Sequence, residues 1–235
     1  EPRSSHDAAV VGDTLYVVGG WRLDHEARKG TWAADMLTLD LSDPEASWSR
    51  AAAPFARRAL AVATAGGKLY VLGGMDAERA VSQQVEVYDP ASRRWTRADD
   101  FPGQGFGMAA VGAEGAVFAS GADGTVYRLD AKTNHWAEAT RSVLPRFFHR
   151  LVATADGTVW AMGGIRPDTQ GARVRLTEPV AGERVTEAIT VQLPSPMASK
   201  NRQGAAVLGD DVYFFGGNDS LGQHDFGPEH FTAGG

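Results

Sequence analysis

The stretch LAVATAGGKLYVLGG, at residues 60–74, decides the fold. It contains a short apolar segment, a Gly66-Gly67 turn, a second apolar segment around Tyr70, and a terminal pair of glycines. Glycine adopts the positive φ angles that two-residue turns between antiparallel strands require. The stretch therefore predicts a β-hairpin that ends on a glycine pair.

The same pattern occurs at four other places in the chain. Its copies are AAVVGDTLYVVGG (8–20), MAAVGAEGAVFASG (108–121), LVATADGTVWAMGG (151–164) and AAVLGDDVYFFGG (205–217). In the copy at 108–121 the glycine pair is aligned with Ser120-Gly121. The period is roughly 50 residues, a spacing that indicates a repeat architecture.

A second signature follows the first three hairpins. It appears as MLTLDLSDPEASWSRA (36–51), VEVYDPASRRWTRA (85–98) and VYRLDAKTNHWAEA (126–139). Apolar residues alternate up to an Asp, a polar turn follows, and a Trp opens the next segment. Alternation at period two indicates a half-buried strand, so each repeat is predicted to hold four strands.

The glycine pair, the strand that ends in Tyr-Asp or Leu-Asp, and the Trp about six residues later resemble the kelch repeat. The resemblance covers essentially the whole chain. It implies an all-β fold, a kelch-type β-propeller of four-stranded antiparallel blades. The fourth repeat departs from the pattern, because residues 165–196 contain neither Tyr-Asp nor Trp, although 172–177 and 185–193 still read as strands.

We expect a single domain of about four and a half blades. The expected boundaries are 1–51, 52–100, 101–142, 143–195 and, for a partial fifth blade, 196–235. The resemblance implies closure with six or seven blades, and an unclosed ring leaves an edge that invites aggregation. The sequence is therefore interpreted as part of a longer propeller, with closure by unusual means as the alternative.

Composition excludes several classes of function. Lys and Arg number 23 against 29 Asp and Glu, a net charge of -6, which argues against binding to nucleic acid or to an anionic membrane surface. No apolar run approaches the length of about 18 residues that a membrane helix needs, so no membrane insertion is expected. Cysteine is absent, which excludes disulfides and thiolate metal sites.

The candidate site follows from hairpin geometry. In an antiparallel hairpin, the residues that enter the first strand and those that follow the second strand lie at the same end. In a propeller these ends gather around the mouth of the central channel. The arginines found there are Arg3, Arg22, Arg57, Arg58, Arg146, Arg150, Arg166 and Arg202. The candidate ligand-binding residues are Arg3, Trp21, Arg22, Arg57, Arg58, Phe106, Phe147, His149, Arg150, Arg166, Arg202 and Asn218.

Arginines interleaved with aromatic residues suit an anionic, partly apolar ligand, because Arg supplies paired donors and aromatic rings supply contact area. We therefore predict a binding module for a protein partner or an anionic small molecule or sugar. The resemblance points the same way, since kelch domains of ubiquitin-ligase adaptors hold acidic peptides at these positions. The competing interpretation is structural: each arginine pairs with a carboxylate of a neighbouring blade.

An enzyme of the bacterial sialic-acid mutarotase type is the alternative. It would need an Arg for the substrate carboxylate and a Glu or His for proton transfer. His6 and His149 lie at the mouth, but both can equally be packed structural histidines, so no catalytic residue is assigned. The Ala, Gly and Arg bias favours a bacterial periplasmic or extracellular protein.

Other chemistry finds no support in the sequence. The copper site of galactose oxidase needs a cysteine, and the iron motif of plant specifier proteins, Glu-x-x-x-Asp-x-x-x-His, does not occur. Histidine and acidic residues share the segments 21–34 and 218–235, yet solvated loops explain them better than a metal site. No metal and no cofactor are expected.

Overall fold

The computed structural model describes residues 2–24, 29–141, 145–167, 173–175, 180–184, 189–192, 201–209, 211–217 and 228–232. Among them, strands form four four-stranded sheets, one three-stranded sheet and two hairpins, and every pairing is antiparallel. We call the five sheets blades 1 to 5, in chain order. The predicted all-β propeller of four-stranded antiparallel blades is confirmed.

The strands of each blade follow one another outward from the centre. Blade 1 holds β1 (Asp7–Val11), β2 (Thr14–Val18), β5 (Asp35–Asp40) and β6 (Ser49–Ala52). Blade 2 holds β7 (Ala61–Ala65), β8 (Lys68–Leu72), β9 (Val85–Asp89) and β10 (Arg94–Arg97). Blade 3 holds β11 (Ala109–Ala113), β12 (Ala116–Ser120), β13 (Thr125–Asp130) and β14 (Trp136–Arg141).

Blades 4 and 5 complete the arc. Blade 4 holds β15 (Arg150–Ala153), β16 (Val159–Met162), β19 (Val180–Arg184) and β20 (Ile189–Gln192). Blade 5 holds β21 (Gly204–Leu208), β22 (Asp211–Phe215) and β23 (Pro228–Thr232). The strand expected at 172–177 is not part of blade 4. Its described part, β18 (Arg173–Arg175), pairs instead with β17 (Ile165–Pro167) in a separate hairpin.

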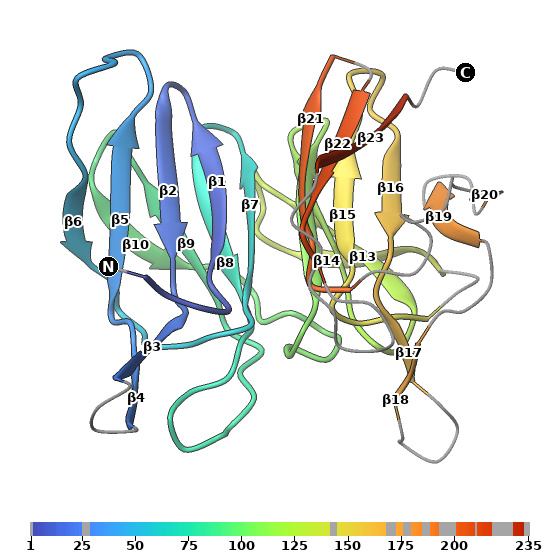
Figure 1. Ribbon diagram of the computed structural model, residues 1–235, viewed down its shortest axis with the longest axis horizontal. Coiled ribbons are helices and arrows are strands. Elements are labelled where there is room, and N and C mark those ends of the chain that lie inside the picture. The colour runs from blue at the N-terminus through green and yellow to red at the C-terminus, as the bar shows by residue number, and fades with distance from the viewer. Residues whose placement is uncertain are drawn as a thin grey trace.

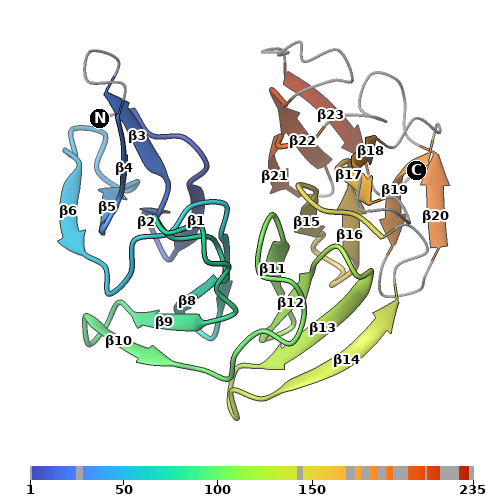
Figure 2. The same ribbon diagram turned by 90° about the horizontal axis from the view of Figure 1, so that it is seen from below.

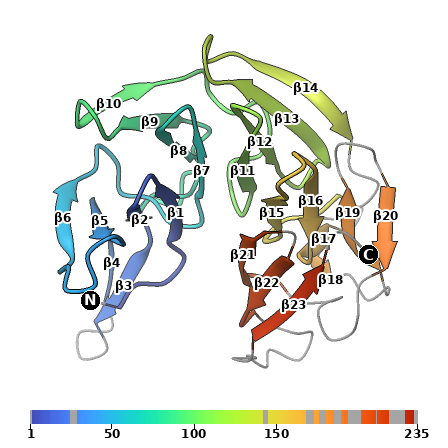
Figure 3. The same cartoon turned by 90° about the horizontal axis from the view of Figure 1, so that it is seen from above.

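The innermost strands β1, β7, β11, β15 and β21 stand around a common axis, and blades 1 and 5 form the two ends of the arc (Figures 2 and 3). The hairpin of β3 (Trp21–Asp24) and β4 (Lys29–Trp32) and the hairpin β17–β18 project from the same end of the blades (Figure 1). This is the end where the innermost strands of blades 1, 2, 4 and 5 begin and their glycine pairs follow the second strands.

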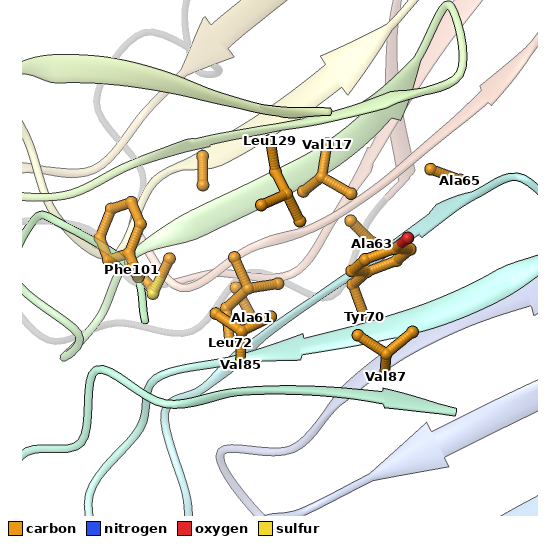
Figure 4. Packing of buried hydrophobic residues seen from close by; sticks show 12 residues of the cluster. Ala61, Ala63, Ala65, Tyr70, Leu72, Val85, Val87, Phe101, Val117 and Leu129 are labelled. Carbon is orange, nitrogen blue, oxygen red and sulfur yellow. The ribbon is translucent and has the colours of Figure 1, made fainter. Parts of the chain in front are cut away.

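Neighbouring blades pack face to face through apolar side chains. Between blades 2 and 3, Tyr70 and Leu72 meet Val117 and Leu129, with Phe101 at one end of the cluster (Figure 4). All five are at most 1% exposed. Burying a side chain of this kind contributes about 1.5–3 kcal/mol, so these interfaces account for much of the stability of the fold.

Consecutive blades are also joined by backbone hydrogen bonds, which we call the rim. Each blade contributes one residue of positive φ just before its first strand: Ser5, Ala59, Gly107, Phe148 and Arg202, with φ between 53° and 65°. The Ala59 N–H donates to the Ser5 carbonyl (2.9 Å), and the series continues through Gly107 and Phe148 to the N–H of Arg202. The rim therefore fixes the spacing of the blades with main-chain atoms.

Strand register corrects the alignment of the third repeat. Ser120 pairs with Ala109, as Leu72 pairs with Ala61 in blade 2. Ser120 is thus the last residue of its strand, and Gly121 with Ala122 takes the place of the glycine pair. The Ser120 hydroxyl lies 2.7 Å from Nε2 of His149 in blade 4, so a polar contact stands where Leu72 of blade 2 makes an apolar one.

Candidate functional site

A cavity of about 450 Å³ opens inside the rim, and we call it the mouth cavity. Its lining comes from all five blades: Ser4, Ser5, His6, Asp7, Ala59, Leu60, Gly107, Met108, Phe148, His149, Arg150, Arg202, Gly204 and Gly217. A second space of about 580 Å³, the channel, runs between the innermost strands. The two share the lining residues His6, Asp7, Arg150 and Gly204.

Asp7 and Arg150 form an ion pair at this shared boundary. Arg150 Nη1 lies 2.8 Å from Asp7 Oδ1, and Arg150 Nε donates to the Gln203 carbonyl at 2.6 Å. The other Asp7 oxygen accepts the N–H of Val62 at 2.9 Å. The pair thereby connects blades 1, 2, 4 and 5, and it separates the mouth cavity from the channel.

Arg202 and Phe148 form the aromatic side of the mouth cavity. The Arg202 guanidinium lies 4.3 Å from the centre of the Phe148 ring, within the range of a cation–π contact. Phe148 also contacts Phe147 and Phe106, with ring centres 4.9 and 5.4 Å apart. Arg202 is exposed, so this side of the cavity presents a positive charge above an apolar surface.

His149 is buried under the mouth cavity and is neutral at physiological pH. Burial, followed by the charges of Arg146 and Arg150, holds its pKa well below the ordinary value of 6.5. His6, on the cavity wall, donates from Nδ1 to the Arg3 carbonyl at 3.1 Å. Its pKa is lowered as well, mainly by partial burial. Protonation of either ring is therefore disfavoured.

Three of the arginines lie inside the blades instead of at the cavity surface. Arg3 pairs with Asp35 at 3.0 Å, and Arg57 pairs with Glu86. Arg146 donates to the carbonyls of Gly163 (3.0 Å) and Ala161 (3.4 Å). The carboxylates belong to the same blade as their arginine, whereas the structural alternative anticipated neighbouring blades. Burial lowers the pKa of Arg57, and Glu86 opposes that shift.

The hairpin β3–β4 holds a further group of the candidate residues. The Arg58 guanidinium lies 5.4 Å from the Trp21 ring centre and 5.6 Å from that of Trp32. Trp32 Nε1 donates to the Met75 carbonyl at 3.1 Å. These contacts fix the hairpin against blade 2. Arg22 is half-buried on the same hairpin and lines a groove away from the mouth cavity.

The structure thus brings His149, Arg150 and Arg202 together at the mouth cavity, with Phe106 and Phe147 behind Phe148. Arg3, Arg57, Trp21, Arg22 and Arg58 are not among its lining residues. Arg166 lies in β17, but its side chain is outside the described part of the chain, and Asn218 is outside the described residues altogether.

Sequence reasoning missed Asp7 and Phe148. Asp7 is the first residue of β1, one position after the last candidate that precedes the strand, His6. By register, the same position holds Ala61, Ala109 and Gly204 in blades 2, 3 and 5 and Arg150 in blade 4. Two opposite charges at a position that otherwise holds small residues were therefore the available signal. Phe148 adopts a φ of 53°, and the sequence carries no signal for that conformation at a phenylalanine.

Within the described residues, no three His, Asp or Glu side chains are grouped so that they could hold a metal ion. The loop histidines His25 and His224 fall outside that part of the chain. The described residues also include no helix long and apolar enough to cross a membrane.

Comparisons with known proteins agree with this architecture. The Kelch motif family model matches residues 56–102. Alpha-scruin of Limulus polyphemus is 26% identical over 185 residues, which are 73% of this chain and 20% of that protein. Kelch-like protein 36 of Mus musculus is 32% identical over 111 residues, 46% of this chain and 18% of that protein. The chain thus spans about a fifth of the length of these relatives.

A solved structure titled "Structure of YjhT" superposes on the fold with a TM-score of 0.70 at 18% identity. The match covers 92% of this chain and 73% of that one. At this identity the likeness concerns the fold alone. The repeat signatures, the matching Kelch motif, the kelch-family relatives and the arrangement of four-stranded blades together support a kelch-repeat family for this chain.

Proposed function

We propose that the chain is a binding module that holds an acidic segment of a partner protein in the mouth cavity. A kelch propeller is generally a protein-interaction module. The observation that carries the proposal is the placement of Arg202 over Phe148, at a cavity that Arg150 also lines. This group offers positive charge on a protein whose net charge is -6.

The chemistry of the cavity suits a carboxylate attached to an apolar stem. The guanidinium fork of arginine donates paired hydrogen bonds to a carboxylate. Phe148 and Met108 supply apolar contact area beside it. A volume of about 450 Å³ falls within the range of ligand pockets. The cavity is therefore suited to one or two side chains of a partner.

Asp7 competes with any anionic ligand for Arg150. Because Asp7 already pairs with Arg150, an incoming carboxylate must compete with Asp7 for the Arg150 guanidinium. We therefore expect Arg150 to select for ligands able to displace Asp7.

An anionic sugar is the second candidate ligand, and one observation favours it. The hydroxyl groups of Ser4 and Ser5 line the same cavity as His6, and imidazole is the side chain that most often serves as a general base. A sugar carboxylate at Arg202 would then lie in the same cavity as a base. Catalysed exchange of sialic-acid anomers, followed by NMR, would favour this candidate over the binding module.

A displayed library of short random peptides tests the main proposal. We expect the selected peptides to be enriched in Asp and Glu, and Arg202→Ala and Arg150→Ala to weaken their binding by at least about tenfold. Arg141→Ala is the matched control, because Arg141 is an exposed arginine on the outermost strand of blade 3, paired with Glu138. Circular dichroism confirms that the variants fold.

Selected peptides without acidic enrichment would contradict the proposal. Equal affinity of the Arg202 and Arg150 variants and the Arg141 control would contradict it as well.

A further inference from the structure

The rim residues differ in size although they share one backbone conformation. From blade 1 to blade 5 they are Ser5, Ala59, Gly107, Phe148 and Arg202, all with φ between 53° and 65°. Serine, alanine, phenylalanine and arginine are thus accommodated at this conformation, so the backbone alone does not require glycine in blade 3. A contact with a neighbouring blade explains why residue 107 has no side chain.

The Phe148 ring occupies the space next to Gly107. A Cβ added at residue 107 would lie 2.8 Å from Cε1 and 2.9 Å from Cδ1 of that ring. The backbone joins the same two residues, because the Phe148 N–H donates to the Gly107 carbonyl at 2.6 Å. Carbon atoms in contact stand about 3.5–4.0 Å apart, so a methyl group at residue 107 and the ring cannot both keep their places.

Arg202 repeats this arrangement one blade further on. Its N–H donates to the Phe148 carbonyl at 2.9 Å, and its guanidinium lies 4.3 Å from the centre of the Phe148 ring. Each of these side chains lies against the rim residue of the preceding blade, Phe148 on Gly107 and Arg202 on Phe148. We call the three residues the rim stack. All three line the mouth cavity.

The surroundings of Phe148 decide which way its ring can move. Phe147 and Phe106 contact it with ring centres 4.9 and 5.4 Å away, and Phe147 is buried. Phe148 itself is half-buried and borders the cavity. A side chain at residue 107 would therefore push the ring toward the cavity, where no packed side chain opposes it, and Arg202 would be displaced with it.

We propose that Gly107 is a positioning residue for the ligand of the mouth cavity. By lacking a side chain, it keeps the Phe148 ring back from the cavity and places the Arg202 guanidinium where it can meet a carboxylate. The inference rests on the proposed function, which assigns Arg202 to the ligand. It adds that a residue of blade 3 controls the affinity of a cation in blade 5.

Gly107→Ala tests the proposal, with Gly115→Ala as the matched control. Gly115 belongs to the same blade and has a φ of +71°, and nothing lies within 4 Å of an added Cβ. Both changes strain the backbone, but only Gly107→Ala displaces a ring. Two quantities are measured: the NMR chemical shifts of the Arg202 Nε and Cδ protons in the free chain, and the affinity for an acidic peptide selected from the displayed library.

Protons over the face of an aromatic ring are shifted upfield, so the Arg202 protons should show this shift in the unsubstituted chain. We expect Gly107→Ala to move them toward ordinary arginine values and to weaken peptide binding by at least about tenfold, whereas Gly115→Ala changes neither. Unchanged Arg202 signals in Gly107→Ala would overturn the inference and leave the proposed function standing. If the unsubstituted chain bound no acidic peptide, the proposed function would fail, and the role of Gly107 in binding with it.

A double variant separates displacement of the ring from general damage to the fold. Phe148→Ala removes the ring, so Gly107→Ala should lower the urea midpoint less in that background than in the unsubstituted chain. An equal decrease in both backgrounds would contradict the contact. If Gly107→Ala alone does not fold, recovery of folding in the double variant supports the proposal, and failure to recover counts against it.

Discussion

Asp7 and Arg150 hold the same position in their repeats and meet across the channel as an ion pair. Asp7 pairs with Val18 in β2 as Arg150 pairs with Met162 in β16, and the two charged groups lie 2.8 Å apart. The equivalent residues in the other blades are Ala61, Ala109 and Gly204. The other blades have small residues at this position, whereas the opposite charges of Asp7 and Arg150 link blade 1 to blade 4.

Removing the Asp7 charge should strengthen the binding of anionic ligands. In Asp7→Asn the Arg150 guanidinium keeps its place but no longer has a competing carboxylate. We expect the affinity for a selected acidic peptide to rise by up to about tenfold, measured by calorimetry at low salt. Asp123→Asn removes an exposed carboxylate near Phe106 and serves as the control. Unchanged affinity in Asp7→Asn would show that Arg150 takes no part in binding.

Stability should fall in mild acid because of His149. Its folded-state pKa lies well below 6.5, its ordinary value, so the neutral form is the one that the fold accommodates. The contribution is fully present above about pH 6.5 and is lost as the pH falls toward the folded-state pKa, since the unfolded chain then binds a proton that the fold excludes. Urea unfolding at pH 7.5 and pH 5.5 measures the loss.

His149→Met, the residue type that Met108 provides in blade 3, should reduce this pH dependence. His135→Gln is the control, because His135 is exposed and its hydrogen bond to Asp99 raises its pKa, which contributes stability in acid. Identical pH profiles for His149→Met and the unsubstituted chain would contradict the assignment.

Breaking the buried pair of Arg57 and Glu86 should be costly. Glu86→Gln leaves the Arg57 charge buried without its counter-charge, and we expect a loss of about 3–5 kcal/mol in the free energy of unfolding. Asp100→Ala, which removes the exposed partner of Arg97, should cost less than about 1 kcal/mol. Denaturant titration compares the two. The paired change Arg57→Met with Glu86→Leu should recover part of the loss, since blade 1 carries Leu37 at the position of Glu86.

Gly164 should tolerate no side chain. Its φ is +97°, and an added Cβ would lie 2.8 Å from His149 Cβ and 3.0 Å from the Phe147 carbonyl oxygen. Gly66 also has a positive φ, +56°, but nothing lies within 4 Å of an added Cβ. Gly66→Ala should therefore cost about 1–2 kcal/mol and Gly164→Ala clearly more, measured by thermal unfolding. Equal costs would mean that backbone conformation alone requires glycine at both sites.

The fold was predictable because its signals are local. Each hairpin, turn and alternating strand is encoded within about 15 residues, and the period repeats them. The pairing within the fourth repeat was not predictable for the same reason. The segment 172–177 alternates as a strand does, and nothing local shows that its described part pairs with β17 and not with blade 4.

The site was less predictable because it depends on contacts between distant residues. The sequence places Arg57 beside Arg58 at one end of a blade, but whether it faces a ligand is decided by Glu86, 29 residues further on. Likewise, Arg150 and Asp7 are separated by 143 residues. Nothing in a local pattern distinguishes an arginine with such a partner from one that faces a cavity.

The rim also bears on how this protein can change over evolution. Its links are main-chain N–H and carbonyl groups, and it passes through residues as different as Ser5, Ala59 and Phe148. Substitution of side chains around the opening therefore leaves the hydrogen bonds between blades intact. Side chains around the opening can therefore change one at a time during evolution while the main-chain hydrogen bonds between blades are kept.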